Sequence, residues 1–178
     1  KAEVLGAPPD PRANSTGYML QRDHLFDWRT IEQNALLGLE VKKRLNAETH
    51  AYAAELLDRY GLGAFKDYYP RQLSGGMKQK AALIRTLAFS PELLLLDEPF
   101  SALDYQQRLL LADEVHSIIK RGGYTAVLVT HDISEAICMS DRVIILSERP
   151  ARIRKQVEIN MGSDTPLERR SNPLFREY

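Results

Sequence analysis

The 178-residue chain has a single cysteine, Cys138, so no disulfide can form within it and no cysteine-based metal cluster can be built. Such sparse cysteine favours a reducing compartment. The 24 Lys and Arg residues equal the 24 Asp and Glu residues in number, so net charge points to no polyanion, and we expect no nucleic-acid partner. No apolar run approaches the roughly 20 residues of a membrane-spanning helix, and the longest, near Leu93–Leu96, has the length of a strand.

Two further absences concern the start of the chain and its nucleotide-binding motifs. The chain begins at Lys1 instead of Met and carries no signal-peptide pattern, so we expect that an N-terminal portion precedes it. No Gly-x-x-x-x-Gly-Lys-Ser/Thr phosphate loop occurs anywhere in the sequence. What is present, 44% apolar and 27% charged residues, suits one globular domain or a large piece of one.

The first part of the chain is expected to be mostly helical. Lys1–Thr16 is rich in proline and predicts loop or turn, and Gly17–Gln21 predicts a short strand that ends at a polar residue. Apolar residues at helical spacing over residues 31–39 predict one helix. A second helix is expected to begin at Asn46 as N-cap and to end near Tyr60.

After Leu73, strands alternate with helices, which predicts an α/β fold with a mainly parallel, covered sheet. The uninterrupted apolar runs of the first two strands predict that both are buried on both faces. The expected elements are a helix capped by Ser74 that reaches Phe89, a strand at Leu93–Leu96, a helix from Asp104 to Arg121, a strand at Thr125–Thr130, a helix capped by Asp132, a strand at Arg142–Leu146 and its hairpin partner at residues 151–159.

The motif with the strongest chemical content is "LLLLDEP". Four leucines deliver Asp97 and Glu98 to the end of a central strand, where α/β sheets place their ligands. Asp97 there suits Mg²⁺, held through water, because magnesium prefers oxygen ligands. Glu98 points differently and could polarise an attacking water, a role worth roughly 10²–10⁴-fold in rate. The alternative is a carboxylate pair that caps the following turn, and it is disfavoured by the four leucines and by Pro99.

A second motif, "LSGGM", covers Leu73–Met77. Ser74, Gly75 and Gly76 stand where a helix begins, with free backbone amides and the positive end of the helix dipole exposed. The absent side chains of the two glycines let an anion approach the backbone closely. The alternative is an ordinary serine cap preceded by a flexible turn, and this motif alone does not separate the two.

Together with the later run "VLVTHDISEAICMSDRVIIL", these motifs closely resemble the nucleotide-binding domain of ABC transporters, over about Gly17–Glu158. The matching segments are the signature motif at Leu73–Met77, the Walker B strand at Leu93–Asp97, the catalytic glutamate at Glu98, the D-loop at Ser101–Asp104, the switch histidine at His131 and the Q-loop glutamine at Gln21. The resemblance implies an α/β P-loop NTPase (RecA-like) domain with a helical subdomain, lacking its N-terminal Walker A portion. The implied parts are the end of the N-terminal part with the Q-loop (1–29), the helical subdomain (30–89), RecA-like core elements (90–160) and a C-terminal tail (161–178).

The resemblance also implies roles for individual residues. Glu98, His131 and Gln21 would be catalytic, Asp97 and Gln21 would hold Mg²⁺, and the nucleotide would be ATP. The residues implied to contact nucleotide are Ser74, Gly75, Gly76, Met77 and Asp104. On the residues alone, His131 could be a hydrogen-bonded structural residue, Gln21 a polar strand end and Asp104 a helix cap, and these alternatives stay open.

The segments "QRDHLFDWRTIEQNALLGLE" and "SERPARI" are similar to ATPases of bacterial importers for nitrate, sulfonate, taurine and related small solutes. The implied partners are a second ABC ATPase subunit in a head-to-tail dimer, a membrane permease and, indirectly, a periplasmic or lipoprotein solute-binding protein. The implied location is the cytoplasmic face of the membrane. Two alternatives are a soluble ABC ATPase that acts in translation or DNA repair, and a truncated non-catalytic subunit that supplies only its signature face.

In this family each signature loop closes on nucleotide held by the phosphate loop of its partner. This chain therefore combines the signature half of a site with Glu98 and His131 of the other half. Without a phosphate loop and its lysine, the β- and γ-phosphates lose their cradle. We predict that the isolated chain binds ATP poorly and does not hydrolyse it, whereas the parent protein does both.

Overall fold

The computed structural model describes Glu3, Gly6, Pro8 and residues 16–162 and 165–178. The loop or turn expected at the start of the chain therefore lies almost wholly outside the described residues.

The chain divides into two compact units. Unit 1 runs up to Met19 and resumes over Asp23–Leu95, whereas unit 2 consists of Leu20–Arg22 and Leu96–Tyr178. The elements of unit 1 are β1 (Thr16–Met19), α1 (Ile31–Val41), α2 (Ala47–Arg59), the short 3-10 helices η1 (Gly63–Phe65) and η2 (Pro70–Gln72), α3 (Gly75–Leu87) and the start of β2 (Leu93–Asp97). Those of unit 2 are the end of β2, α4 (Tyr105–Gly122), β3 (Thr125–Val129), α5 (Ile133–Met139), β4 (Arg142–Leu146), β5 (Ile153–Glu158), α6 (Pro166–Ser171) and the 3-10 helix η3 (Pro173–Glu177).

Side-chain caps decide where the helices of unit 1 begin. The side chains of Thr30 and Asn46 each accept a hydrogen bond from the amide of the third residue of the helix that follows. The backbone amides of Thr30 and Asn46 donate in return to the side chain of that residue, which completes a capping box at α1 and at α2. Ser74 accepts from the amide of Met77 at the start of α3. Gly61 has φ +76°, a conformation that costs glycine little, and it lies just beyond the end of α2. The three helices expected from the sequence in this unit are thus confirmed.

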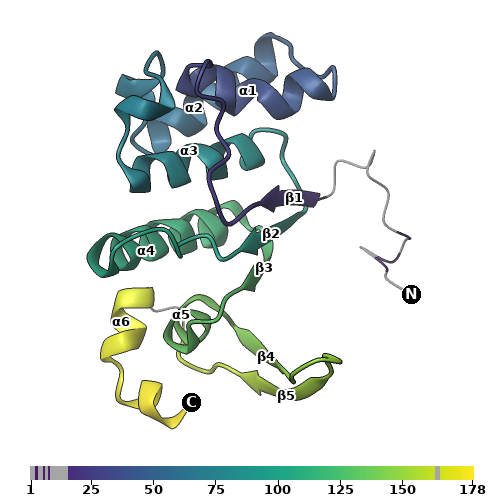
Figure 1. Ribbon diagram of the computed structural model, residues 1–178, viewed down its shortest axis with the longest axis vertical. Coiled ribbons are helices and arrows are strands. Elements are labelled where there is room, and N and C mark those ends of the chain that lie inside the picture. Colours follow the sequence, from purple (N-terminus) through teal and green to yellow (C-terminus); the bar gives the residue numbers. More distant parts are fainter. Residues whose placement is uncertain (1–2, 4–5, 7, 9–15, 163–164) are drawn as a thin grey trace. The chain divides into compact units, whose positions relative to one another are not determined.

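The core of unit 1 lies between its helices, where α1 packs against both α2 and α3 (Figure 1). Leu39, Leu57 and Leu83, one from each helix, are almost wholly buried there. Burial of a leucine contributes roughly 1.5–3 kcal/mol, so the apolar faces of these helices, and not their intrinsic helix propensity, dominate the stability of the unit.

Strands β1, β2 and β3 form a three-stranded sheet in that order. The prediction that β2 is buried on both faces is wrong, because its residues alternate between buried and half-buried. The same prediction is wrong for β3, where Val127 and Val129 are exposed. A strand is buried on both faces only when layers cover both, and the described residues provide that cover on one face of β2 alone.

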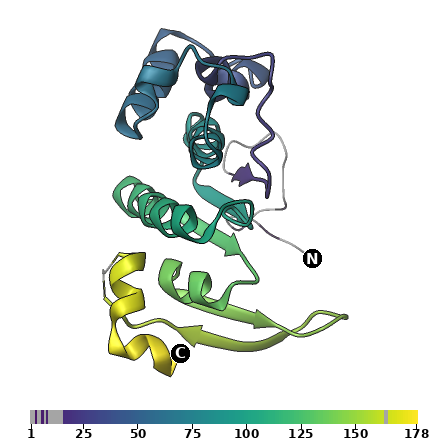
Figure 2. The ribbon, with the colours of Figure 1, turned by 60° about the vertical axis from the view of Figure 1, so that its left-hand side comes forward.

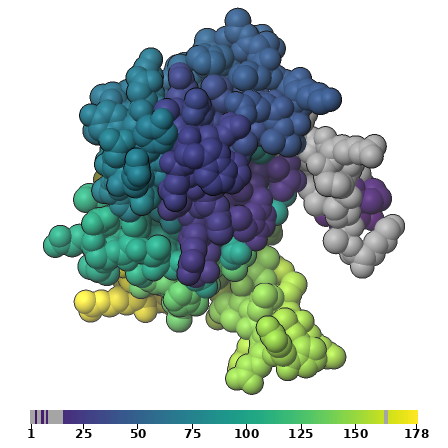
Figure 3. All heavy atoms as spheres, turned by 45° about the horizontal axis from the view of Figure 1, so that its top comes forward, coloured from purple at the N-terminus to yellow at the C-terminus, as the bar shows by residue number. Residues whose placement is uncertain are grey.

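The strand expected at Arg142–Leu146 does not join that sheet. It pairs antiparallel with β5 in a separate two-stranded sheet, with Val143 opposite Val157 and Ile144 opposite Gln156. The hairpin partner predicted for this strand is therefore confirmed. The space-filling view shows this hairpin protruding from the rest of its unit, in light green, which agrees with the exposed Ile145 and Leu146 near its tip (Figure 3).

The C-terminal helix α6 packs against α4 and α5 (Figure 2). Its Arg169 is 1% exposed and donates hydrogen bonds to three backbone carbonyls: Cys138 (3.2 Å), Ser140 (2.9 Å) and Gly162 (2.8 Å). An arginine can be buried here because its Nη1 and Nη2 atoms donate to acceptors on several sides, although its buried Nε atom has no hydrogen-bond partner among the described residues. Arg169 thereby fastens the end of the chain to the end of α5.

Candidate functional site

The end of β2 holds Glu98 in an unusual backbone conformation. Glu98 has φ +43°, which is in the left-handed region, and such a conformation costs a non-glycine residue about 1–3 kcal/mol. Its amide donates to the carbonyl of Val129 on β3 (2.8 Å), and its own carbonyl accepts from the amide (3.2 Å) and the hydroxyl (3.0 Å) of Ser101. The backbone around Glu98 is thus held by hydrogen bonds at both its amide and its carbonyl.

Two side chains from distant parts of unit 2 hold the Glu98 carboxylate. Gln21 donates from Nε2 to one oxygen (2.9 Å), and Nδ1 of His131 lies 2.9 Å from the other. An ionised carboxylate only accepts hydrogen bonds, so in that state Nδ1 of His131 carries the hydrogen and Nε2 of the neutral ring is an acceptor. The His131 side chain is 75% exposed and that of Glu98 27%, so the cluster opens to solvent.

The sequence predicted each of these three residues from a different motif, and the structure brings them into one cluster. Asp97 is the last residue of β2 and directly precedes Glu98. Asp104 lies further along, at the N-cap of α4, where its carboxylate accepts from the amide of Gln107 (3.0 Å). The cap alternative for Asp104 therefore describes its bonding in this structure.

The loop that carries His131 is braced by the predicted cap Asp132 and by Arg108, which the sequence had not singled out. Asp132 donates its amide to the hydroxyl of Thr130 (3.1 Å), and its carboxylate accepts from the amide of Glu135 (3.1 Å) and pairs with Arg108 (3.4 Å). Arg108 also donates to the carbonyl of Leu103 in the D-loop segment (3.3 Å). A sequence signal for this brace is hard to find, because Arg108 and Asp132 are 24 positions apart.

Glu135, one turn into α5, is buried beneath this loop. Burial, and to a smaller extent the negative charge of the neighbouring Asp132, raise its pKa from the ordinary 4.5 to about 7, although a hydrogen bond with Thr130 acts in the opposite sense. Its Oε1 atom has no hydrogen-bond partner among the described residues. The carboxyl therefore titrates near neutral pH immediately below the His131 loop.

The signature segment, Leu73–Met77, belongs to unit 1. Ser74 Oγ accepts from the amide of Met77 (3.3 Å), and Gly75 and Gly76 are in ordinary right-handed helical conformation at the start of α3. Ser74 and Gly75 are exposed. The serine cap and the exposed helix N-terminus are therefore both present, and the first turn of α3 still offers backbone amides that have no partner within the helix.

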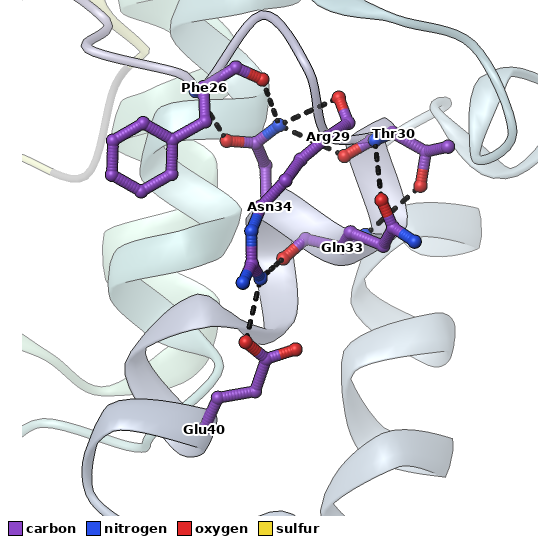
Figure 4. A network of polar contacts seen from close by, with 6 residues as sticks. All are labelled: Phe26, Arg29, Thr30, Gln33, Asn34 and Glu40. Carbon is purple, nitrogen blue, oxygen red and sulfur yellow. Dashed lines mark hydrogen bonds and ion pairs between the residues drawn. The ribbon is translucent and has the colours of Figure 1, made fainter.

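The segment after Gln21 also contains residues whose role the sequence did not reveal. Asn34 of α1 is wholly buried and binds the backbone of Phe26, Arg29 and Thr30, as Figure 4 shows. Trp28 is 73% exposed and stacks on Phe26 with ring centroids 4.7 Å apart. The segment from Phe26 to Thr30 is thus held by the buried Asn34, whereas its Trp28 side chain faces solvent.

No metal site of three or more His, Cys, Asp or Glu side chains is formed by residues 16–162 and 165–178. Within the same residues, none of the helices combines the length and the apolar character needed to cross a bilayer.

Comparison with known proteins places this arrangement in a family. The sequence profile of the ABC transporter family matches residues 7–101. The chain is 47% identical over 175 residues to the uncharacterized ABC transporter ATP-binding protein YtlC of Bacillus subtilis, and the match covers 97% of this chain and 67% of YtlC. It is 39% identical to the nitrate import ATP-binding protein NrtD of Synechocystis (91% of this chain, 63% of NrtD). It is also 39% identical to the aliphatic sulfonates import ATP-binding protein SsuB of Bacillus licheniformis (90% of this chain, 60% of SsuB).

A solved structure agrees with these relatives. It is a dimeric post-hydrolysis state of the ATP-binding cassette MJ0796 bound to ADP and Pi, with 29% identity, a TM-score of 0.66 and coverage of 82% of this chain and 63% of that chain. The chain spans about 60–67% of the length of these relatives. Its fold is the ABC ATPase variant of the P-loop NTPase fold. On the profile match, the sequence identities and the fold, this chain belongs to the ABC transporter family, as an ATP-binding domain.

Proposed function

We propose that the protein containing this chain is the ATP-hydrolysing subunit of an importer for nitrate, a sulfonate, taurine or a similar small solute, and that it couples hydrolysis to transport through a membrane permease. The observation that carries the proposal is the Glu98 carboxylate held between Gln21 and His131 at the end of β2. The names of the NrtD and SsuB relatives support the importer assignment. The proposed location is accordingly the cytoplasmic face of the membrane.

The residues at the end of β2 fit Mg²⁺ as a cofactor. Asp97 and the amide oxygen of Gln21 are oxygen donors of the kind that magnesium takes, and one or two protein ligands suffice when phosphates and water complete the shell. When bound, Mg²⁺ would neutralise charge on the phosphates of ATP.

The cluster around Glu98 suits activation of a water molecule. The Glu98 carboxylate can accept a proton from a water, and Gln21 and His131 hold that carboxylate in place while leaving it partly open to solvent. His131 would in addition contact the γ-phosphate, as the family resemblance implies. The braced backbone of Glu98 keeps the carboxylate in one position, which is what a general base requires.

We propose that the signature segment Ser74–Met77 and Asp104 act on nucleotide held by a second ABC ATPase subunit in a head-to-tail dimer. The exposed first turn of α3, with its free amides, supports this role because helix N-termini favour phosphate. The dimeric state of the MJ0796 neighbour supports the pairing. No phosphate loop occurs in the 178 residues, so the isolated chain should bind ATP poorly.

The test is ATP hydrolysis by the full-length gene product, with and without its permease. Glu98→Gln should lower kcat at least about 10²-fold while ATP binding persists, because the glutamine amide cannot accept a proton from water as the carboxylate does. Glu92→Gln is a matched control, since Glu92 is an exposed glutamate just before the same strand, and it should leave kcat unchanged. Equal rates for both variants would contradict the role of Glu98.

The same assay separates the three functions. Turnover that depends on the permease supports the importer, and transport measured with nitrate, taurine and an alkanesulfonate then identifies the solute. Turnover that is independent of a permease would indicate a soluble ABC ATPase. A full-length protein that binds but never hydrolyses ATP would indicate a non-catalytic subunit.

A further inference from the structure

Arg85 lies in the last turn of α3 and holds the segment that follows Gln21. Its guanidinium donates from one nitrogen to the carbonyl of His24 and from another to the carbonyl of Asp23, both at 2.7 Å. Hydrogen bonds from a charged donor are roughly twice as strong as neutral ones, and these two use the fork of the guanidinium. All three residues belong to unit 1.

The backbone that Arg85 holds is strained at His24. His24 has φ +45°, in the left-handed region that few residues other than glycine adopt. The Asp23 carboxylate accepts from the amide of Leu25 (3.0 Å), which fastens the same turn from within. A strained residue persists only where its surroundings over-determine it, and Arg85 supplies part of that restraint.

The far end of the same segment is fastened separately. Asn34 accepts from the amide of Phe26 (2.8 Å) and donates to carbonyls of Phe26, Arg29 and Thr30 (Figure 4). The segment Asp23–Thr30 is therefore tied to α3 at its start and to α1 along the rest of its length. It behaves as part of the helical body of unit 1 and not as a loose connection.

Gln21 is joined to the anchored segment by a very short length of chain. A single residue, Arg22, separates Gln21 from Asp23, and both Gln21 and Arg22 belong to unit 2. Gln21 in turn donates to the Glu98 carboxylate. Arg85 of α3 is therefore linked to Gln21 through the carbonyls that it holds and the backbone of one intervening residue.

We propose that Arg85 is a positioning residue for the reaction. It holds the carbonyls of Asp23 and His24 on α3, so that the placement of Gln21 against Glu98 depends on the helix that begins with the signature segment. This rests on the proposed ATPase function. Because Arg85 acts through Gln21, loss of either residue should damage the same property of the site.

A double-mutant cycle tests this on the full-length protein with its permease. Arg85→Met should lower kcat about tenfold, with KM changed by less than about twofold, because the nucleotide contacts are intact and only Gln21 is misplaced. In a Gln21→Ala background the same change should lower kcat by less than about twofold. Arg85→Lys should recover part of kcat, since an ammonium can still donate to these carbonyls. Fully multiplicative losses in the two backgrounds would overturn the proposal.

Thr86→Val is the matched control. Thr86 is the next residue of α3, buried, and its hydroxyl donates to the carbonyl of Ala82 (2.9 Å). The change weakens the same helix without touching Asp23 or His24. Its effect on kcat should be the same with glutamine or alanine at position 21.

A second readout does not require ATP hydrolysis. Trypsin cleaves after the exposed Arg22, and release of Asp23 and His24 should raise that cleavage rate about tenfold in Arg85→Met but not in Thr86→Val. Equal cleavage in both variants would overturn the proposal. If the wild-type protein shows no turnover, the proposed function fails, and the cleavage rates still decide whether Arg85 holds this segment.

Discussion

Replacement of Asn34 by aspartate tests whether the segment after Gln21 is held as the structure indicates. The change exchanges Nδ2 for an oxygen of similar size, so packing is preserved and only hydrogen bonding is altered. Nδ2 donates to three carbonyls, those of Phe26 (3.1 Å), Arg29 (3.1 Å) and Thr30 (2.9 Å), at a site with 0% exposure. An aspartate would turn an oxygen toward these carbonyls, while its other oxygen could still accept from the amide of Phe26.

The expected loss of stability follows from the number of hydrogens involved. Two N–H hydrogens are removed, and each hydrogen bond contributes about 0.5–1.5 kcal/mol, so about 1–3 kcal/mol is lost even before charge is considered. Buried carbonyls disfavour the ionised form, so the folded-state pKa of the introduced carboxyl group should lie above the unfolded value of about 3.9. The folded variant then binds more protons than the unfolded one, and its stability falls as pH rises from about 4 through the folded-state pKa.

Urea unfolding at pH 5 and pH 8 measures this loss. Asn34→Asp should lower the unfolding midpoint at both values and more strongly at pH 8. Asn46→Asp is the matched control in the same unit, because Asn46 is an exposed N-cap whose side-chain oxygen accepts from Thr49, and aspartate caps equally well. A loss at pH 8 within about 0.5 kcal/mol of the control would refute the reasoning.

Three further outcomes can be checked by the same unfolding assay. Arg169→Met should cost about 3 kcal/mol, because three backbone carbonyls lose the donor that they share. Glu135→Gln should remove a pH dependence: with a pKa raised from 4.5 to about 7, the folded protein keeps a proton that the unfolded chain releases, so wild-type stability should fall between these pH values and that of the variant should not. At pH 8 the variant should be the more stable protein, and a wild-type midpoint that is flat from pH 5 to 8 would contradict the shift. Gly17→Ala should cost about 1–3 kcal/mol, since a Cβ there would lie 2.6 Å from Cγ2 of Thr86, and a neutral result would show that β1 can move away from α3.

Helix starts were predictable because the interactions that decide them are local. Thr30, Asn46, Ser74, Asp104 and Asp132 all cap helices in the structure as N-cap residues. Each cap bond joins residues only three positions apart, so the letters of one turn suffice to predict it. The hairpin of β4 and β5 was predictable for the same reason, since its strands are neighbours in the chain.

Burial of the strands was not predictable from their letters. "LLLL" and "TAVLVT" are apolar throughout, yet β2 is buried on alternate residues and β3 exposes Val127 and Val129. Apolar side chains are more stable when they are buried, but whether a helix or another sheet packs over a given face of the strand depends on the rest of the structure. Similarly, nothing in "RVIIL" distinguishes a strand of a central sheet from one of a separate hairpin.

The sequence by itself determined the family, the order of the motifs and the candidate residues Gln21, Glu98 and His131, because motif letters and their spacing are properties of the chain. Tertiary structure alone decided that these three side chains meet at one carboxylate, since they come from positions 77 and 33 residues apart. It alone also showed the restraints by Arg85 and Asn34 on the segment next to Gln21. These restraints are hydrogen bonds from side chains to backbone carbonyls, which are alike in every residue, so no pattern of letters marks them in advance.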